Sequence, residues 1–289
     1  WFRMHARGYD CSVHDSTDEL SALALQGPLA RAVLKNIVEF DMDRMRFFRV
    51  RKTTLAGLPV WISRTGYTGD LGYEIWMENQ HALGVWDALM QAGAPHGLQP
   101  IGLNALDVCR IEAGFVLQGV DYICARRCVI EERKSTPQEV GLGWTVDLER
   151  DPFLGQAALF RERDTGPEWD LVGVELDWGA LEGLYNAYNL PPHLAPIACR
   201  GTVPVYGAGG SQIGQVTSST WSPITKRYVC LATLKKQHAG LGTAVQVEHT
   251  VEFGERKRAP ATIVERPFFD PERKRFTPGS AKKTAKENA

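Results

Sequence analysis

Apolar and polar positions alternate most regularly at residues 73–78, where the glycine-rich stretch RTGYTGDLGYEIW (64–76) ends. Apolar side chains occupy every second position there, at Tyr73, Ile75 and Met77. A period of two is typical of a strand with one buried face, so we expect a strand that ends near Glu78. Glu74 then lies at the start of this strand, on the opposite face, beside a turn in which glycine permits close backbone approach.

The rest of the first half alternates between strand-like and helix-like periods. We predict strands at residues 20–26, 46–55, 59–64 and 141–146, and helices at residues 29–37, 81–90 and 100–113. Pro28 and Pro100 precede or open two of these helices, where a missing backbone N–H costs nothing.

The last of these helices carries several polar side chains, namely Asn104, Asp107, Arg110 and Glu112. Ion pairing on the helix surface is the expected role for them. In the short apolar run that follows, Gln118, Asp121 and Tyr122 are candidates to face a cleft.

Beyond a charged, partly helical connector at residues 147–169, the pattern changes to short strands between Gly, Pro and polar turns. We predict strands at residues 171–176, 202–206, 212–218, 228–234, 244–248 and 261–264. Close spacing of this kind favours a small antiparallel barrel or sandwich. The segment 178–200 is a long insertion of undecided role, and we expect the polar, lysine-rich residues after Phe276 to be disordered.

Composition narrows the class of protein. The formal net charge is −1, with 44% hydrophobic and 23% charged residues, so no charge excess points to nucleic acid or a membrane surface. No apolar run approaches a membrane span, and no secretory signal opens the chain. The six cysteines form no CxxC pair, which predicts reduced thiols in a cytoplasmic protein and no metal site.

The glycine-rich stretch is the best candidate for chemistry. A carboxylate at Glu74 can accept paired N–H donors from a heterocycle, and Tyr67 can stack on a flat ligand or hydrogen-bond to it. The alternative, which these residues alone slightly favour, is a glycine-rich hairpin with a solvated acid.

Five motifs occur in an order that resembles a known family. They are LALQGP (23–28), RTGYTGDLGYE (64–74), RIEAG (110–114), TPQEVGLGW (136–144) and GQVTSSTWSPITKR (214–227). This order is similar to that of the glycine cleavage T-protein (aminomethyltransferase) family, which includes folate-dependent one-carbon transferases and demethylases.

The resemblance implies an α+β fold that encloses folate in the central cavity of a three-domain ring. We expect a folate-binding α+β domain portion at residues 1–146, the connector at 147–169, a small antiparallel β-barrel domain at 170–268 and a disordered tail at 269–289. The chain begins at Trp1 rather than at methionine, so we expect the N-terminal part of the first domain to be missing.

The resemblance also implies which residues bind tetrahydrofolate. Glu74 is similar to the carboxylate that pairs with the pterin ring, and Tyr67 to the aromatic residue beside it. Arg110 is a third candidate for cofactor binding, although a structural role is the more expected one. No catalytic residue is assigned within the chain, because the family's aspartate belongs to a section upstream of it.

One position departs from the family pattern. Leu106 stands where the T-protein has an arginine that binds the glutamate tail of folate. Leucine cannot bind a carboxylate, so we expect the pterin end to be held more strongly than the tail. In this respect the chain resembles the demethylase and oxidase-linked branches.

The implied activity is tetrahydrofolate-dependent transfer of an aminomethyl or methyl group by an enzyme, with a lipoyl-bearing carrier protein as a possible partner. Folate-dependent O-, S- or N-demethylation is one alternative. The folate module of a larger oxidase is another. A non-catalytic folate-binding accessory protein is disfavoured, because Leu117-Gln118-Gly119 replaces the lysine-glycine-cysteine motif of that branch.

Overall fold

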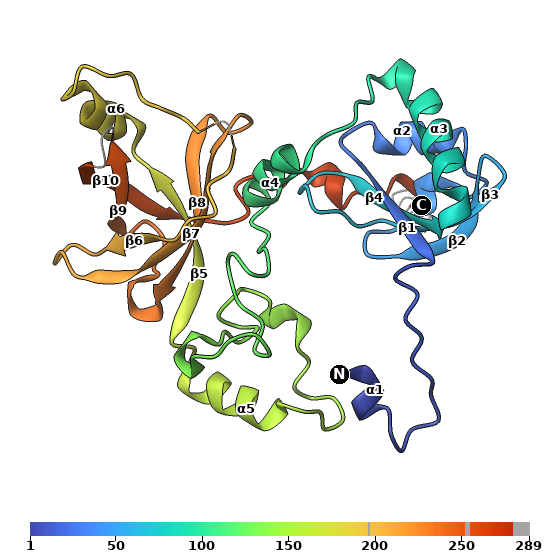
Figure 1. The fold of residues 1–289 in the computed structure, drawn as a ribbon, viewed down its shortest axis with the longest axis horizontal. Helices are drawn as coiled ribbons and strands as arrows, with labels where there is room; N and C mark the ends of the chain where they lie inside the picture. The colour runs from blue at the N-terminus through green and yellow to red at the C-terminus, as the bar shows by residue number, and fades with distance from the viewer. Residues whose placement is uncertain (196, 252–254, 280–289) are drawn as a thin grey trace, which may run out of the picture. The chain divides into compact units, whose positions relative to one another are not determined.

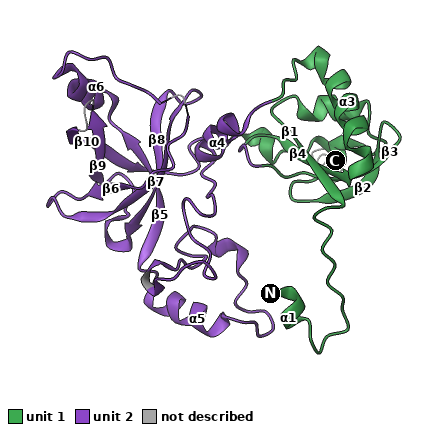
Figure 2. Ribbon diagram, viewed as in Figure 1, with its two compact units in different colours: residues 1–66, 70–100, 271–289 green, residues 67–69, 101–270 purple. Residues whose placement is uncertain are grey.

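The computed structural model describes residues 1–195, 197–251 and 255–279 of the chain (Figure 1). They form two structural units (Figure 2). Unit 1 comprises residues 1–66, 70–100 and those from 271 onward, whereas unit 2 comprises residues 67–69 and 101–270. The division differs from the expected boundary at residue 146, because residues 101–146 belong with the barrel rather than with the first sheet.

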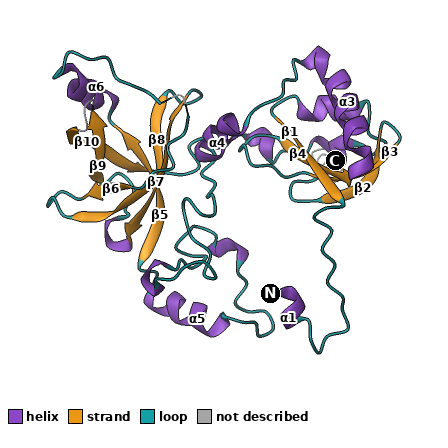
Figure 3. Ribbon diagram, in the orientation of Figure 1, coloured by secondary structure: helices purple, strands orange, loops and turns teal. Residues whose placement is uncertain are grey.

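Unit 1 is built on a four-stranded antiparallel sheet in the order β1-β4-β3-β2 (Figure 3). Its strands are β1 (Leu20–Gln26), β2 (Val50–Leu55), β3 (Leu58–Ser63) and β4 (Gly72–Glu78). Its helices are α1 (Phe2–His5), α2 (Ala30–Lys35) and α3 (Ala82–Gly93). β1 and β4 pair along their whole length, from Leu20 opposite Glu78 to Gln26 opposite Gly72.

The core of unit 1 follows the predicted alternation. Tyr73, Ile75 and Met77 of β4 are all 0% exposed, and they pack in one cluster with apolar side chains of α2 and α3. Glu74 lies between them in sequence and therefore projects from the other face of the sheet. Burial of one face thus fixes the face on which Glu74 lies.

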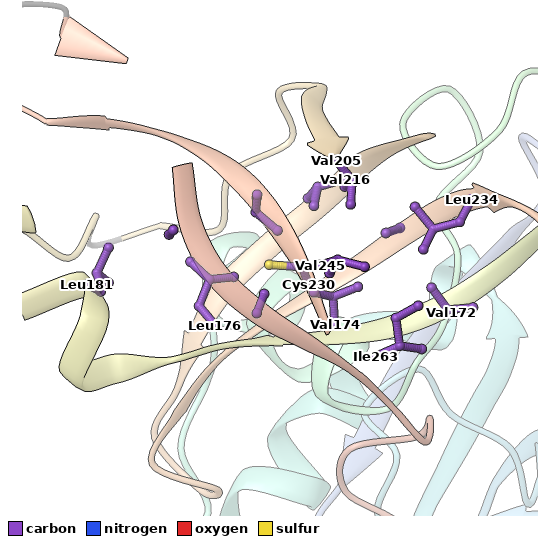
Figure 4. Close-up of a cluster of buried hydrophobic side chains, with 14 of the residues drawn as sticks. Val172, Val174, Leu176, Leu181, Val205, Val216, Cys230, Leu234, Val245 and Ile263 are labelled. Atoms are coloured by element: carbon purple, nitrogen blue, oxygen red, sulfur yellow. The ribbon is translucent and has the colours of Figure 1, made fainter. Parts of the chain in front are cut away.

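Unit 2 contains a closed antiparallel barrel in the order β10-β5-β8-β7-β6-β9. Its strands are β5 (Trp169–Leu176), β6 (Val203–Tyr206), β7 (Gln212–Ser222), β8 (Arg227–Lys235), β9 (Ala244–Val251) and β10 (Glu255–Val264). Figure 4 shows the labelled valines, Leu234, Ile263 and Cys230 gathered in the barrel core. The expected α+β class with a small antiparallel barrel is confirmed.

Three helices belong to unit 2: α4 (Leu103–Glu112), α5 (Gln156–Thr165) and α6 (Trp178–Asn186). Leu181 and Tyr185 of α6 join the barrel core. On another face of the barrel, Ile111 of α4 packs in a separate buried cluster that includes Leu231 of β8. Strand β8 is therefore buried on both faces, which explains why residues 228–234 read as an almost continuous apolar run.

Short 3₁₀ helices complete the secondary structure: η1 (Met42–Arg44), η2 (Asn79–His81), η3 (Ala94–His96), η4 (Glu131–Arg133), η5 (Gly143–Thr145), η6 (Lys236–His238) and η8 (Glu272–Lys274). Over the residues that the structure describes, no helix combines the length and apolarity needed to cross a membrane.

Two sequence expectations are corrected, and the insertion of undecided role is found to contain a helix. The predicted strand at 141–146 is the 3₁₀ turn η5, because Thr145 and Val146 donate locally to the carbonyls of Leu142 and Gly143. The helix expected at 100–113 begins only at Leu103, after Gly102 in extended conformation. The insertion 178–200 opens with helix α6, which Asp177 caps by accepting a hydrogen bond from the backbone N–H of Ala180.

The expected disordered tail is also corrected in part. Residues 271–279 form part of unit 1, and Lys274 and Thr277 are 7% and 8% exposed. They are ordered because buried Arg64 donates hydrogen bonds to the Lys274 carbonyl and the Thr277 hydroxyl. Residues 280–289 of the expected tail lie outside the described residues.

Candidate functional site

Glu74 occupies the third position of β4, and its neighbours across the sheet are Ala24 of β1 and Ser63 of β3. The side chain is half-buried. The Thr65 hydroxyl donates to Oε2 of Glu74, and Thr65 Oγ1 is 2.7 Å from the Ser63 hydroxyl. Ser63 Oγ itself is 3.5 Å from Oε2, at the limit of a hydrogen bond.

These contacts orient the Glu74 carboxylate but do not use all of its hydrogen-bond acceptor capacity. Among the described residues, no protein donor contacts Oε1 of Glu74, whereas Oε2 is held by Thr65. A carboxylate oxygen can accept more than one hydrogen bond. The group therefore retains acceptor capacity for a ligand with paired N–H donors, as the sequence predicts for this residue.

Gln26, at the end of β1, contacts backbone carbonyl oxygens of the glycine-rich turn through its side chain. Its side-chain Nε2 donates to the carbonyl oxygen of Tyr73 at 3.2 Å and lies 3.5 Å from that of Thr65. A Cβ on either Gly66 or Gly72 would lie 2.0 Å from Gln26 Oε1. A side chain at either glycine would therefore force the Gln26 carboxamide to move away from the turn, and this close approach connects the LALQGP and RTGYTGDLGYE motifs in space.

Tyr67 belongs to unit 2, whereas Glu74 belongs to unit 1. Its hydroxyl donates to the Val116 carbonyl oxygen at 2.6 Å, and its ring stacks on Phe115 with centroids 5.6 Å apart. Burial raises the pKa of Tyr67 above its ordinary value, so the phenol stays protonated as a donor. The structure thus anchors the ring of Tyr67 against the segment that follows α4.

Arg110 lies inside unit 2, with its side chain 1% exposed. Its Nε donates to Asp107 at 2.7 Å, Nη1 to Asp121 at 2.5 Å and to the Phe115 carbonyl at 3.2 Å, and Nη2 to Ser218 at 2.8 Å. Asp107, Arg110 and Glu112 are all buried, so the expected surface ion pairing on this helix is wrong for these three residues. A buried charge of this kind requires pairing, which Asp107 of α4 and Asp121 of the following segment provide, and Ser218 of β7 adds a neutral acceptor.

Asp121 is the centre of the network rather than a cleft-facing residue. It accepts hydrogen bonds from the hydroxyls of Thr217 and Ser218, both at 2.6 Å, and from the Leu117 backbone N–H at 2.7 Å. Local sequence does not reveal this role, because Thr217 and Ser218 are separated from Asp121 by about a hundred residues. The available signal was the run of small hydroxyl residues in TSSTWS, which has few apolar side chains for a barrel strand.

Leu106 is partly exposed on α4, one position before buried Asp107. Its aliphatic side chain offers no donor to an anionic group. The expectation that a folate tail is weakly held at this position stays a prediction.

Two family models match the chain. The GCVT N-terminal domain matches residues 1–150, and the glycine cleavage T-protein C-terminal barrel domain matches residues 190–270. The second match falls largely on the closed barrel of unit 2.

Curated relatives include a trimethylamine-oxide aldolase of Ruegeria pomeroyi, 35% identical over 95% of this chain and 33% of its own length. An aminomethyltransferase of Bacillus pumilus is also 35% identical, over 93% of this chain and 66% of that protein. The chain therefore spans about a third of the first relative and just under two thirds of the second.

A solved structure shares the fold. It is aminomethyltransferase T of the glycine cleavage system from Bartonella henselae, with a TM-score of 0.58, 18% identity and coverage of 87% of this chain and 84% of that one. With one family model covering more than half of the residues, the chain belongs to the glycine cleavage T-protein family.

Proposed function

We propose that this chain binds tetrahydrofolate and forms part of a folate-dependent one-carbon transferase of the aminomethyltransferase type. The observation that carries the proposal is the Glu74 carboxylate, which Thr65 holds by one oxygen while the other has no donor among the described residues. The residues fit a pterin, because one carboxylate can accept a ring N–H and the adjacent exocyclic amine together.

Each residue has a separate part in this proposal. Glu74 binds and orients the pterin, and Thr65 holds the carboxylate of Glu74 in the orientation needed for that contact. Tyr67 is proposed as the aromatic residue that stacks on the pterin. Its hydroxyl is held by the Val116 carbonyl, and its ring is held by stacking on Phe115. When bound, tetrahydrofolate supplies the nitrogen that accepts the one-carbon unit.

Arg110 is proposed as a positioning residue rather than as a ligand of folate. All three of its guanidinium nitrogens donate to protein atoms, and the side chain is 1% exposed. Through Asp121 and the Phe115 carbonyl it fixes the segment on which Tyr67 rests. Its contribution to folate binding is therefore indirect.

The direct test is calorimetry of the full chain with 5-formyltetrahydrofolate. Replacing Glu74 by Gln removes one charge-assisted acceptor, and we expect affinity to fall by roughly 10- to 100-fold while the fold is kept. Glu78→Gln is the matched control, because Glu78 is an exposed acid on the same face of β4. Absence of binding by the natural chain, or an unchanged affinity in Glu74→Gln, would contradict the proposal.

The one-carbon donor is a second question, with two candidates. An aminomethyl group on a lipoyl-bearing carrier protein agrees with the aminomethyltransferase relatives. A methylated amine oxide agrees with the similarity to the trimethylamine-oxide aldolase over 95% of this chain. Supplying each donor separately and following consumption of tetrahydrofolate by chromatography distinguishes them, with the Glu74→Gln variant as the blank.

A further inference from the structure

The chain comes back to unit 1 at Pro271, and the returning segment contacts both flanks of the glycine-rich turn. Arg64 precedes the turn and Asp70 follows its second glycine, and each side chain binds residues between 273 and 277. Neither residue has a role predicted from the local sequence.

Arg64 binds the segment through main-chain carbonyls and one side-chain hydroxyl. Its Nη2 donates to the carbonyl oxygens of Lys274 at 3.0 Å and Phe276 at 2.7 Å, and its Nη1 to Thr277 Oγ1 and the Met45 carbonyl, both at 2.8 Å. The residue is 1% exposed, and burial lowers the pKa of its guanidinium. Its Nε has no hydrogen-bond partner among the described residues. An unsatisfied buried N–H costs free energy, and the hydrogen bonds of Nη1 and Nη2 compensate for part of that cost.

Asp70 forms the second connection. Its carboxylate accepts two hydrogen bonds from Arg273, from Nε at 2.7 Å and from Nη2 at 2.6 Å, in a bidentate ion pair. The same carboxylate accepts the backbone N–H of Leu71 at 2.6 Å. The Leu71 carbonyl in turn accepts the N–H of Gly27 at 2.8 Å, which joins the turn to the end of β1.

The segment therefore bonds to residues that flank those holding Glu74. Arg64 is adjacent to Thr65, whose hydroxyl holds the Glu74 carboxylate, and Asp70 lies two residues before the first residue of β4. Displacing the segment would release both flanks of the turn while leaving the helix-covered core of the sheet in place. Supporting contacts of this kind determine whether a binding group is held within the tolerance that a ligand needs.

We propose that Arg64 and Arg273 are positioning residues for the carboxylate of Glu74. Through them the segment 273–277, called the strap below, is joined to the two flanks of the glycine-rich turn. This inference rests on the proposed role of Glu74 in folate binding. It predicts that the strength of folate binding depends on residues that do not touch the ligand.

The test uses the pair Asp70–Arg273, whose side chains are 13% and 45% exposed, since variants of fully buried Arg64 can fail to fold. Asp70→Asn, Arg273→Gln and the double variant are compared for affinity towards 5-formyltetrahydrofolate and for hydrogen exchange of amides 70–75. We expect each single variant to bind about threefold to tenfold more weakly, and the double variant to be no weaker than the weaker single. Exchange of the Leu71 amide should quicken in all three.

Arg275→Gln is the matched control, because Arg275 lies in the same segment but is placed over the ring of Phe47, with its guanidinium carbon 6.0 Å from the ring centroid. Normal affinity and exchange in the Asp70 and Arg273 variants, alongside weakened binding in Glu74→Gln, would overturn this inference alone. If the natural chain binds no folate, the proposed function fails, and unchanged exchange at residues 70–75 would then refute the strap independently.

Discussion

Arg110 and Asp121 form an ion pair with Nη1 and Oδ2 2.5 Å apart, at side-chain exposures of 1% and 0%. Removing one partner of a fully buried pair leaves an uncompensated charge, which is more costly than the pair itself is stabilising. The stability of unit 2 should therefore depend strongly on Arg110.

We expect Arg110→Met to lower the free energy of unfolding by about 3–5 kcal/mol, because Asp121 then lacks its cation. Denaturant-induced unfolding measures this change. Arg200→Gln is the control: Arg200 pairs with Asp107 at 2.8 Å but is 50% exposed, so its loss should cost less than about 1 kcal/mol. Equal effects of the two changes would show that the burial of Arg110 is not the source of its importance.

Gly72→Ala should be destabilising through Gln26. The new Cβ would lie 2.0 Å from Gln26 Oε1 and would displace a carboxamide that donates to the Tyr73 carbonyl. We expect a loss of about 1–3 kcal/mol by thermal or denaturant unfolding.

The coupling can be isolated by a double-mutant cycle. Adding Gly72→Ala to Gln26→Ala should cost much less than adding it to the natural chain, because the obstructing side chain is gone. Gly183→Ala, inside α6 with no atom within 4 Å of the added Cβ, should instead be neutral or stabilising by up to about 1 kcal/mol. Additive losses at Gly72 and Gln26 would contradict the proposed contact.

His249 should make unit 2 less stable in mild acid. Its Nε2 is 3.0 Å from the Tyr185 hydroxyl, the ring of Tyr228 lies edge-on to it, and Lys257 is opposite it on β10. Burial lowers the pKa of His249 in the folded protein, so the unfolded chain binds the proton more readily. Stability from this group is complete above the unfolded pKa and declines as pH falls through it towards the folded value.

We therefore expect the free energy of unfolding to decrease between pH 7 and pH 5, with His249 contributing less than about 1.4 kcal/mol per pH unit. His249→Phe should reduce the slope, and His14→Gln, a change at an exposed position, should not. A slope unchanged by His249→Phe would assign the pH dependence to other groups.

Leu106→Arg should increase selectivity for the glutamate tail of folate. We expect the natural chain to bind mono- and polyglutamylated 5-formyltetrahydrofolate with similar affinity, since Leu106 offers no donor. The arginine should improve binding of the glutamylated compound by about tenfold relative to a tetrahydropterin that lacks glutamate. Leu103→Arg, at a position 78% exposed on the same helix, is the control. Strong discrimination by tail length in the natural chain would contradict this assignment.

Local periodicity predicted most of the secondary structure. The alternation at Tyr73, Ile75 and Met77 correctly assigned β4 and the face of Glu74. All six barrel strands were expected, although β10 begins at Glu255, six residues before its expected start. The strand expected at 141–146 was wrong because two glycines and local i→i+3 hydrogen bonds favour a 3₁₀ turn there. Periodicity reports which face of an element is buried. It does not detect a short turn that is closed by local i→i+3 backbone hydrogen bonds.

By itself, then, the sequence determined the class of fold, the glycine-rich turn and the family to which its motifs belong. Only the tertiary structure decided that Asp121 meets Arg110, that Thr65 holds Glu74 and that Arg64 binds the returning segment. These contacts pair positions up to 213 residues apart in sequence. They depend on strand register and on the need to satisfy buried charges, neither of which is expressed in the local pattern of any one segment.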